Sequence, residues 1–256
     1  MRLSGPIYRL KRRARLLARG ENIPLHEAQD RIAREEGFGA WSALSARMAR
    51  NAPLSPLLPR LAEGDMLLLG ARPGHGKTLM GLQLLLDAVR DGRRAVFFTL
   101  EYTDQEVTQR IRSLDDTAVE HAPEIVTSSD ISADFIVRYL SGAPRGTVAV
   151  VDYLQILDQQ RSKPPLSEQM RVLNKFARRT GIILGFISQI DRSFDPERSS
   201  LPGLDDVRLP NPIPAGVFSK TLFLHAGEAR LQQTGQGSAP GLPSSRKAGR
   251  TIIRIP

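Results

Sequence analysis

Residues 67–89 read LLLGARPGHGKTLMGLQLLLDAV, an apolar strand followed by a glycine-rich turn and an amphipathic helix. Glycines at positions 74 and 76 let the backbone curl around phosphate oxygens, so that N–H groups at the positive end of the helix face them. In such a turn the lysine amine bridges the terminal phosphates and the next hydroxyl holds Mg²⁺. Ala71 replaces the first glycine of the usual G-x-x-x-x-G-K-T spacing, but Gly70 directly precedes it, so the loop need not be disabled. The sequence predicts a nucleotide-phosphate loop that comprises Ala71, Arg72, Pro73, Gly74, His75, Gly76, Lys77 and Thr78.

Three further apolar runs each end in a polar residue suited to phosphoryl transfer: VAVVD in Asp152, FFTLE in Glu101 and FISQ in Gln189. The carboxyl ends of parallel strands meet at one edge of an open sheet, where ligands bind. We expect Asp152 to hold the water shell of Mg²⁺ opposite Thr78, and Glu101 to orient and deprotonate an attacking water. The Gln189 amide would sense the terminal phosphate, and Arg192 would carry that state to the next loop. Alone, an Asp at a strand end is more often a cap, so this interpretation depends on the combination.

The region 61–256 alternates continuous apolar runs with helical patterns, which is typical of a parallel sheet covered by helices on both faces. The expected strands are 65–71, 94–101, 146–155 and 181–189, and the expected helices are 77–90, 104–113, 131–141 and 166–179. A hairpin over 219–235 turns near Gly227, and a last short strand covers 251–256. The predicted fold class is therefore α/β, with a mostly parallel sheet.

Residues 1–50 carry the pattern of a small helical module, with helices at 6–19, 23–36 and 40–50 around Trp41. Residues 51–60 contain three prolines and no period, which marks a linker. The first 51 residues hold 11 Lys/Arg against 5 Asp/Glu, so +6 of the net charge of +9 lies there. This asymmetry favours a polyanionic partner, nucleic acid first. A helix face that is merely solvated is an equal alternative.

Composition excludes several classes of protein. The absence of cysteine excludes disulfides, thiolate metal sites and cysteine nucleophiles. The four histidines show no ligand spacing, so no zinc site is expected. No window approaches the roughly 18 apolar residues of a membrane helix, and the N-terminus lacks the apolar segment of a signal peptide. A cytoplasmic protein is the default.

Together these motifs resemble the ATPase domain of the DnaB-type replicative helicases, within the RecA-like class. GARPGHGKT is similar to that family's A-R-P-x-x-G-K-T loop, in which alanine is normal at the first position. TLEYT resembles S-L-E-M, VVDYLQIL resembles I-D-Y-L-Q-L, ISQIDRS resembles L-S-Q-L-N-R-S, and LDDVR resembles L-x-D-L-R. The matches keep their order across roughly residues 62–225.

The resemblance implies a RecA-like twisted sheet that binds ATP and Mg²⁺ through Lys77 and Thr78. It implies that Glu101 is the catalytic base, Asp152 the metal-site acid and Gln189 the phosphate sensor. The family works as hexameric rings around single-stranded DNA, so a homo-oligomeric ATPase that acts on single-stranded DNA is expected. An alternative is an ATP-switched adaptor for DNA or protein without unwinding activity. A small-molecule kinase is less favoured because no arginine-rich lid is evident.

The sequence departs from the family pattern at its two ends. A basic segment of some 50 residues stands in place of a larger N-terminal helical domain. The family's trans-acting K-x-R finger lies before its last strand, where Arg246, Lys247 and Arg250 are the nearest candidates, without the full pattern. The counterparts of the family's DNA-contacting loops are the segments 158–169 and 192–208. Each segment is equally well explained as an ordinary solvated loop.

Overall fold

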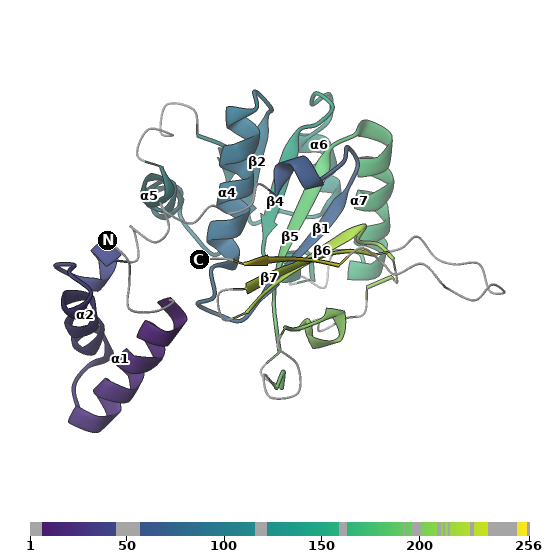
Figure 1. Cartoon of the computed structure of the whole chain (residues 1–256). Helices are drawn as coiled ribbons and strands as arrows, with labels where there is room; N and C mark the ends of the chain where they lie inside the picture. Colours follow the sequence, from purple (N-terminus) through teal and green to yellow (C-terminus); the bar gives the residue numbers. More distant parts are fainter. Residues whose placement is uncertain are drawn as a thin grey trace.

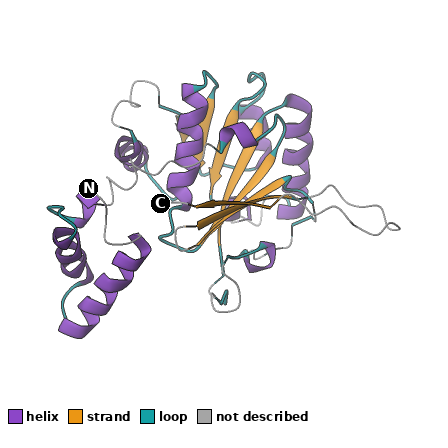
Figure 2. Ribbon diagram, in the orientation of Figure 1, coloured by secondary structure: helices purple, strands orange, loops and turns teal. Residues whose placement is uncertain are grey.

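The chain forms one eight-stranded sheet with helices on both faces, beside a small N-terminal helical module (Figure 1; Figure 2). The computed structural model describes residues 7–44, 57–115, 122–158, 163–191, 193–195, 201–208, 211, 213–214, 216–225, 228–234 and 250–254. The strands are β1 (Met66–Ala71), β2 (Ala95–Thr99), β3 (Glu124–Val126), β4 (Val148–Asp152), β5 (Ile183–Gln189), β6 (Lys220–His225), β7 (Glu228–Gln233) and β8 (Arg250–Arg254). The α-helices are α1 (Ile7–Glu21), α2 (Leu25–Glu35), α4 (Lys77–Arg90), α5 (Asp104–Leu114), α6 (Ala133–Tyr139) and α7 (Leu166–Thr180).

The strand order is β3-β2-β4-β5-β1-β6-β7-β8. The strands from β3 to β6 pair in parallel, and β7 and β8 extend the sheet in antiparallel pairing. The predicted α/β class, the four parallel strands and the C-terminal hairpin are therefore confirmed. The short strand β3 was not expected, because three residues are too few to show a period.

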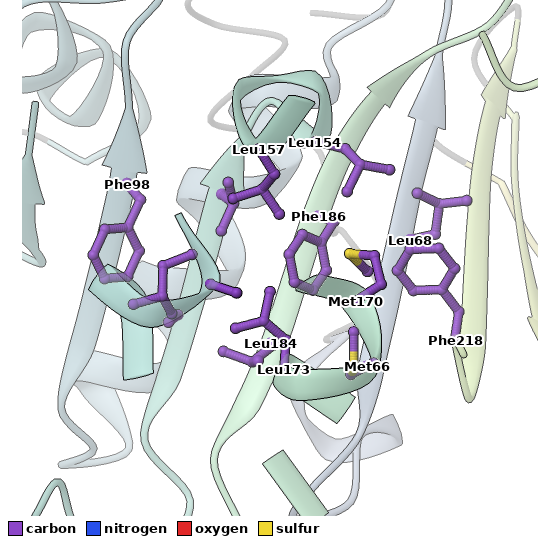
Figure 3. Packing of buried hydrophobic residues seen from close by; sticks show 14 of the residues in the cluster. Met66, Leu68, Phe98, Leu154, Leu157, Met170, Leu173, Leu184, Phe186 and Phe218 are labelled. Carbon is purple, nitrogen blue, oxygen red and sulfur yellow. The ribbon is translucent and has the colours of Figure 1, made fainter. Parts of the chain in front are cut away.

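Each strand of the central sheet sends alternate side chains into two separate apolar layers. From β1, Leu67, Leu69 and Ala71 pack with α4 and α5, whereas Met66 and Leu68 pack with α6 and α7. Figure 3 shows the second layer, where Met170 and Leu173 of α7 meet Leu184 and Phe186 of β5. Burial on both faces explains why the strands are continuous apolar runs. Burying each leucine, methionine or phenylalanine side chain in these layers stabilises the fold by about 1.5–3 kcal/mol.

The N-terminal module has an apolar cluster of its own. Leu10 and Ala14 of α1 pack with Ala28 and Ile32 of α2, and Trp41 lies partly buried against them. The helix α1 extends one residue past Gly20, where the sequence had indicated its end. Residues 41–44 are helical, while 45–50, the rest of the expected third helix, lie outside the described residues.

The predicted linker at 51–60 is described only from residue 57 onward. There Leu57 and Leu58 are buried in the layer beneath α4, and η1 (Leu58–Arg60) forms a single 3₁₀ turn. The division at 51–60 stays a proposal. No helix among the described residues is both long and apolar enough to cross a membrane.

Candidate active site

The loop between β1 and α4 has the backbone that its glycines predict. Gly74 and Gly76 have φ angles of +77° and +84°, in the left-handed region that side chains rarely adopt. A Cβ atom at either position would meet nothing within 4 Å, so the backbone conformation rather than space requires glycine here. Gly76 is the N-cap of α4, so the loop delivers the chain into the positive end of a helix of 14 residues.

A third glycine, Gly70, is required by packing. A Cβ atom there would lie 2.6 Å from a ring carbon of Phe223 on β6. The next residue, Ala71, is still part of β1: its side chain is buried, and its carbonyl accepts a hydrogen bond from the Ile190 amide. Ala71 therefore positions the loop through the sheet, and its methyl group lies in the apolar core.

The first turn of α4 meets the end of β4 in a buried polar contact. The Thr78 hydroxyl donates a hydrogen bond of 2.8 Å to Asp152 Oδ2. Asp152 is fully buried, and its second oxygen, Oδ1, accepts no hydrogen bond from the described residues. Burial raises the pKa of Asp152 to about 6, although the charge of Lys77 and the Thr78 hydrogen bond act in the opposite direction. The structure thus brings together two residues that are 74 positions apart, as the sequence predicts.

These groups fit a magnesium ion. A hydroxyl and a carboxylate with one unsatisfied oxygen are the hard oxygen ligands that Mg²⁺ prefers, together with waters and phosphate oxygens. An unpaired oxygen of a buried carboxylate is costly in a protein without a ligand for it. Thr78 and Asp152 are therefore the residues that would hold the ion.

The other strand ends lie at the same edge of the sheet. The pairing places Thr99 of β2 opposite Asp152, and Gln189 of β5 opposite Ala71. Glu101 follows β2 by two residues; its amide donates to Thr99 Oγ1, its carboxylate is exposed, and its charge raises the pKa of Asp152. The Glu101 carboxylate lines an open cavity of 630 Å³ formed mainly by residues 100–106. All the predicted strand-end residues that the structure describes therefore gather at one edge.

The loop residues Arg72 and His75 contact a cluster that the sequence does not predict. The Arg72 guanidinium donates to the Phe194 carbonyl and lies 5.4 Å from the centre of the Phe194 ring. The His75 ring stacks on His225 at the end of β6, with centroids 5.5 Å apart. No short motif signals these contacts, because their members come from three distant segments.

Gln155, just after β4, is a further residue that the strand-end reasoning missed. Its amide nitrogen donates to Ser188 Oγ at 3.1 Å and to the Arg208 carbonyl. Arg208 in turn donates its backbone N–H to the Gln189 carbonyl. Gln155 thus joins the ends of β4 and β5 to the segment around Arg208. Its position inside VVDYLQIL is the one signal that could have identified it.

Several predicted residues lie outside the described part of the chain. They are Arg246 and Lys247, two of the candidates for a trans-acting finger, and Arg192 after β5. Residues 159–162 and 196–200, within the two candidate DNA loops, are also outside it. The roles of these residues stay predictions.

Comparison with known proteins finds helicases. The chain is 23% identical over 214 residues to the replicative DNA helicase DnaB of Mycoplasma pneumoniae. This match covers 68% of this chain and 45% of the relative. The chain is 25% identical over 179 residues to DnaB of Helicobacter pylori, covering 57% of this chain and 37% of that one. The chain thus spans less than half the length of the curated relatives it matches. No known family model matches it.

Solved structures agree on the fold. A DnaB-like replicative helicase, described with its interactions with primase, superposes with a TM-score of 0.60 at 15% identity over 97% of this chain and 74% of that one. A solved ATPase domain gives 0.57 at 15% identity over 76% of this chain and 82% of its own length. The chain therefore has the fold of these helicase ATPase domains, and its sequence is similar to that of DnaB replicative helicases.

Proposed function

We propose that the chain is an ATP-hydrolysing, DnaB-like helicase or translocase that acts on single-stranded DNA in the cytoplasm as a homo-oligomer, in a hexameric ring. The observation that carries the proposal is the buried Thr78–Asp152 contact with its unsatisfied carboxylate oxygen, directly behind a glycine-built phosphate loop. The sequence similarity to DnaB helicases supports the choice of substrate.

Each residue of the site has a proposed role in hydrolysis. Backbone N–H groups of the loop Ala71–Gly76 bind the phosphates, and the nearly buried Lys77 amine neutralises the charge that develops on them. Glu101 accepts the proton of the attacking water, because its carboxylate is exposed beside the site. Gln189 reports the terminal phosphate, and Gln155 holds the adjoining segment against the same strand end.

Thr78 and Asp152 would hold the magnesium ion, which would supply positive charge against that of the phosphates. Asp152 is ionised at neutral pH, because its pKa of about 6 lies below 7, so it is ready to hold a cation there.

ATPase assays with and without single-stranded DNA, combined with solution mass, test the proposal. Lys77→Ala should abolish hydrolysis, whereas Glu101→Gln should still bind ATP and lose at least about 100-fold in turnover, the usual contribution of a general base. Hydrolysis by the parent chain that rises with DNA, in an oligomer, supports the motor. ATP binding by a monomer without DNA-dependent turnover would reject the motor and support the alternative of an ATP-switched adaptor.

The proposed finger is tested by mixing subunits. A chain with Arg246→Ala and Lys247→Ala keeps its own phosphate loop, whereas Lys77→Ala keeps its finger. If the finger acts on the neighbouring subunit, mixed oligomers of the two inactive variants recover ATP hydrolysis at those interfaces where an intact loop meets an intact finger. An arginine supplied in trans raises the rate of hydrolysis by about 10³–10⁵. Failure to recover any activity in oligomers shown to be mixed would reject Arg246 and Lys247.

A further inference from the structure

The N-terminal module carries a basic stripe that is separate from the nucleotide site. Arg12, Arg15 and Arg19 lie on one face of α1, at spacings of three and four residues, with the exposed Leu16 between them. The opposite face of the helix supplies Leu10 and Ala14 to the module's core. The three guanidinium groups therefore face away from the rest of the module. We name Arg12, Arg15 and Arg19 the α1 stripe.

The acidic side chains of the module are committed to other groups. Arg13, on the flank of α1, pairs with Glu35 at 2.6 Å and with Glu36 at 3.8 Å. On α2, Arg31 pairs with two more carboxylates, those of Glu21 and Glu27. The fifth, Asp30, accepts the backbone N–H of Trp41. Among the described residues, no carboxylate lies within 4.0 Å of an α1-stripe guanidinium. The positive charge of the stripe is thus uncompensated within the module.

We propose that the α1 stripe binds the phosphate backbone of duplex DNA. Guanidinium groups match phosphate oxygens in geometry as well as in charge. A membrane surface fits less well, because the apolar face that such a helix would insert is already buried in the module's core. A single strand also fits less well, because its binding relies on aromatic stacking platforms, and the described rings of Phe38 and Trp41 pack against that core.

The dimensions suit consecutive phosphates of one strand. Arg12 and Arg19 are seven positions apart in the helix, about 10.5 Å along the axis at 1.5 Å per residue. Phosphates of one duplex strand advance about 3.4 Å per base pair along the duplex axis and also turn around it, so three long arginine side chains at this spacing can each reach one phosphate. Three phosphate contacts contribute about 2.7 to the salt slope of binding, since each contributes about 0.9. Between 50 and 200 mM salt that slope is worth about 40-fold in affinity.

The test measures binding of the 256-residue chain to a short blunt duplex across 50–200 mM salt, without nucleotide. Replacing Arg12, Arg15 and Arg19 by Gln should lower the salt slope by about 2.7, and replacing them by Lys should preserve it. The matched control replaces Arg171, Lys175 and Arg178 of α7 by Gln. These three are equally exposed and also have no carboxylate within 4.0 Å among the described residues, so the control removes the same charge from another helix.

A loss in the α1 variant alone supports the proposal. Equal losses in the α1 and α7 variants would show that net charge, and not the stripe, drives binding, which overturns it. The proposal is also overturned if the α1 variant loses affinity for an equal-length single strand or for anionic vesicles and keeps its affinity for duplex DNA. Lys77→Ala, which removes ATP hydrolysis under the proposed function, should bind duplex as the parent chain does, so the two proposals fail separately.

Discussion

Neutralising Asp152 should stabilise the protein when no metal or nucleotide is present. The carboxylate is fully buried, and its pKa is raised from 3.8 to about 6, chiefly by burial. The folded state therefore holds the Asp152 proton more tightly than the unfolded state does. Ionising this group at neutral pH costs folding free energy, at 1.36 kcal/mol for each pKa unit. The cost is about 3 kcal/mol at pH 7.

The pH dependence of this cost has a definite sign. A raised carboxylate pKa favours the folded state as pH falls, because that state takes up the proton first. The cost should fall to about 1.5 kcal/mol at pH 5 and vanish near pH 3. Asn has nearly the shape of Asp, and its side-chain oxygen can still accept the Thr78 hydroxyl. Asp152→Asn should therefore be more stable than the parent chain by about 3 kcal/mol at pH 7 and by about half of that at pH 5.

Urea unfolding at pH 5, 6 and 7, with chelator present, measures this difference directly. Comparing the two proteins cancels the contributions of the ionisable groups that lie far from position 152. The same variant should lose the stabilisation that Mg²⁺ with ATP gives the parent chain, since the proposed ion site has lost its charge. Equal stability of the two proteins at pH 7, or an advantage of Asp152→Asn that grows toward pH 5, would refute the reasoning.

Gln169→Leu should cost about 2–4 kcal/mol in denaturant unfolding, because the buried Gln169 amide bonds the Ala133 N–H and two backbone carbonyls; a cost below about 1 kcal/mol would contradict that role. Gln155→Leu should lower kcat for ATP about tenfold with little change in KM, since it frees Ser188 and the segment beyond it; an unchanged kcat would exclude the positioning role. His225 should titrate below 6.5 by NMR, because burial and nearby positive charge lower its pKa, so it destabilises the fold as pH falls below 6.5; a pKa above 6.5 would exclude this effect.

The sequence predicted the parts of the site that depend on strand order. Lys77 and Thr78 follow a strand, and Asp152 ends another, so a parallel sheet brings them to one edge whatever the details of packing. The structure places them there, with the Thr78–Asp152 contact formed. Pattern reasoning also identified the helices and the C-terminal hairpin, because their periods extend over many residues.

What the sequence did not reveal depends on contacts between distant segments. The stacking of His75 on His225 joins a loop to the end of β6, and the Gln155 hydrogen bonds join three segments. Neither leaves a local pattern, since each side chain alone reads as an ordinary polar residue. The strand β3 was missed because its three residues, only one of them buried, show no alternation.

Gly70 sets the register of β1 and thereby the position of the phosphate loop in the site. The other residues of β1 are Met, Leu and Ala, and sliding the strand by one residue would simply exchange similar apolar side chains between the two faces of the sheet. Only at Gly70 does the strand lack a side chain, where the ring of Phe223 fills the space. A slipped strand would drive an alanine or a leucine into that ring. The absence of a side chain at Gly70 thus fixes the register of β1, and this register places Lys77 and Thr78 beside Asp152. A phosphate loop transferred into another protein would need a glycine at the same position of its strand.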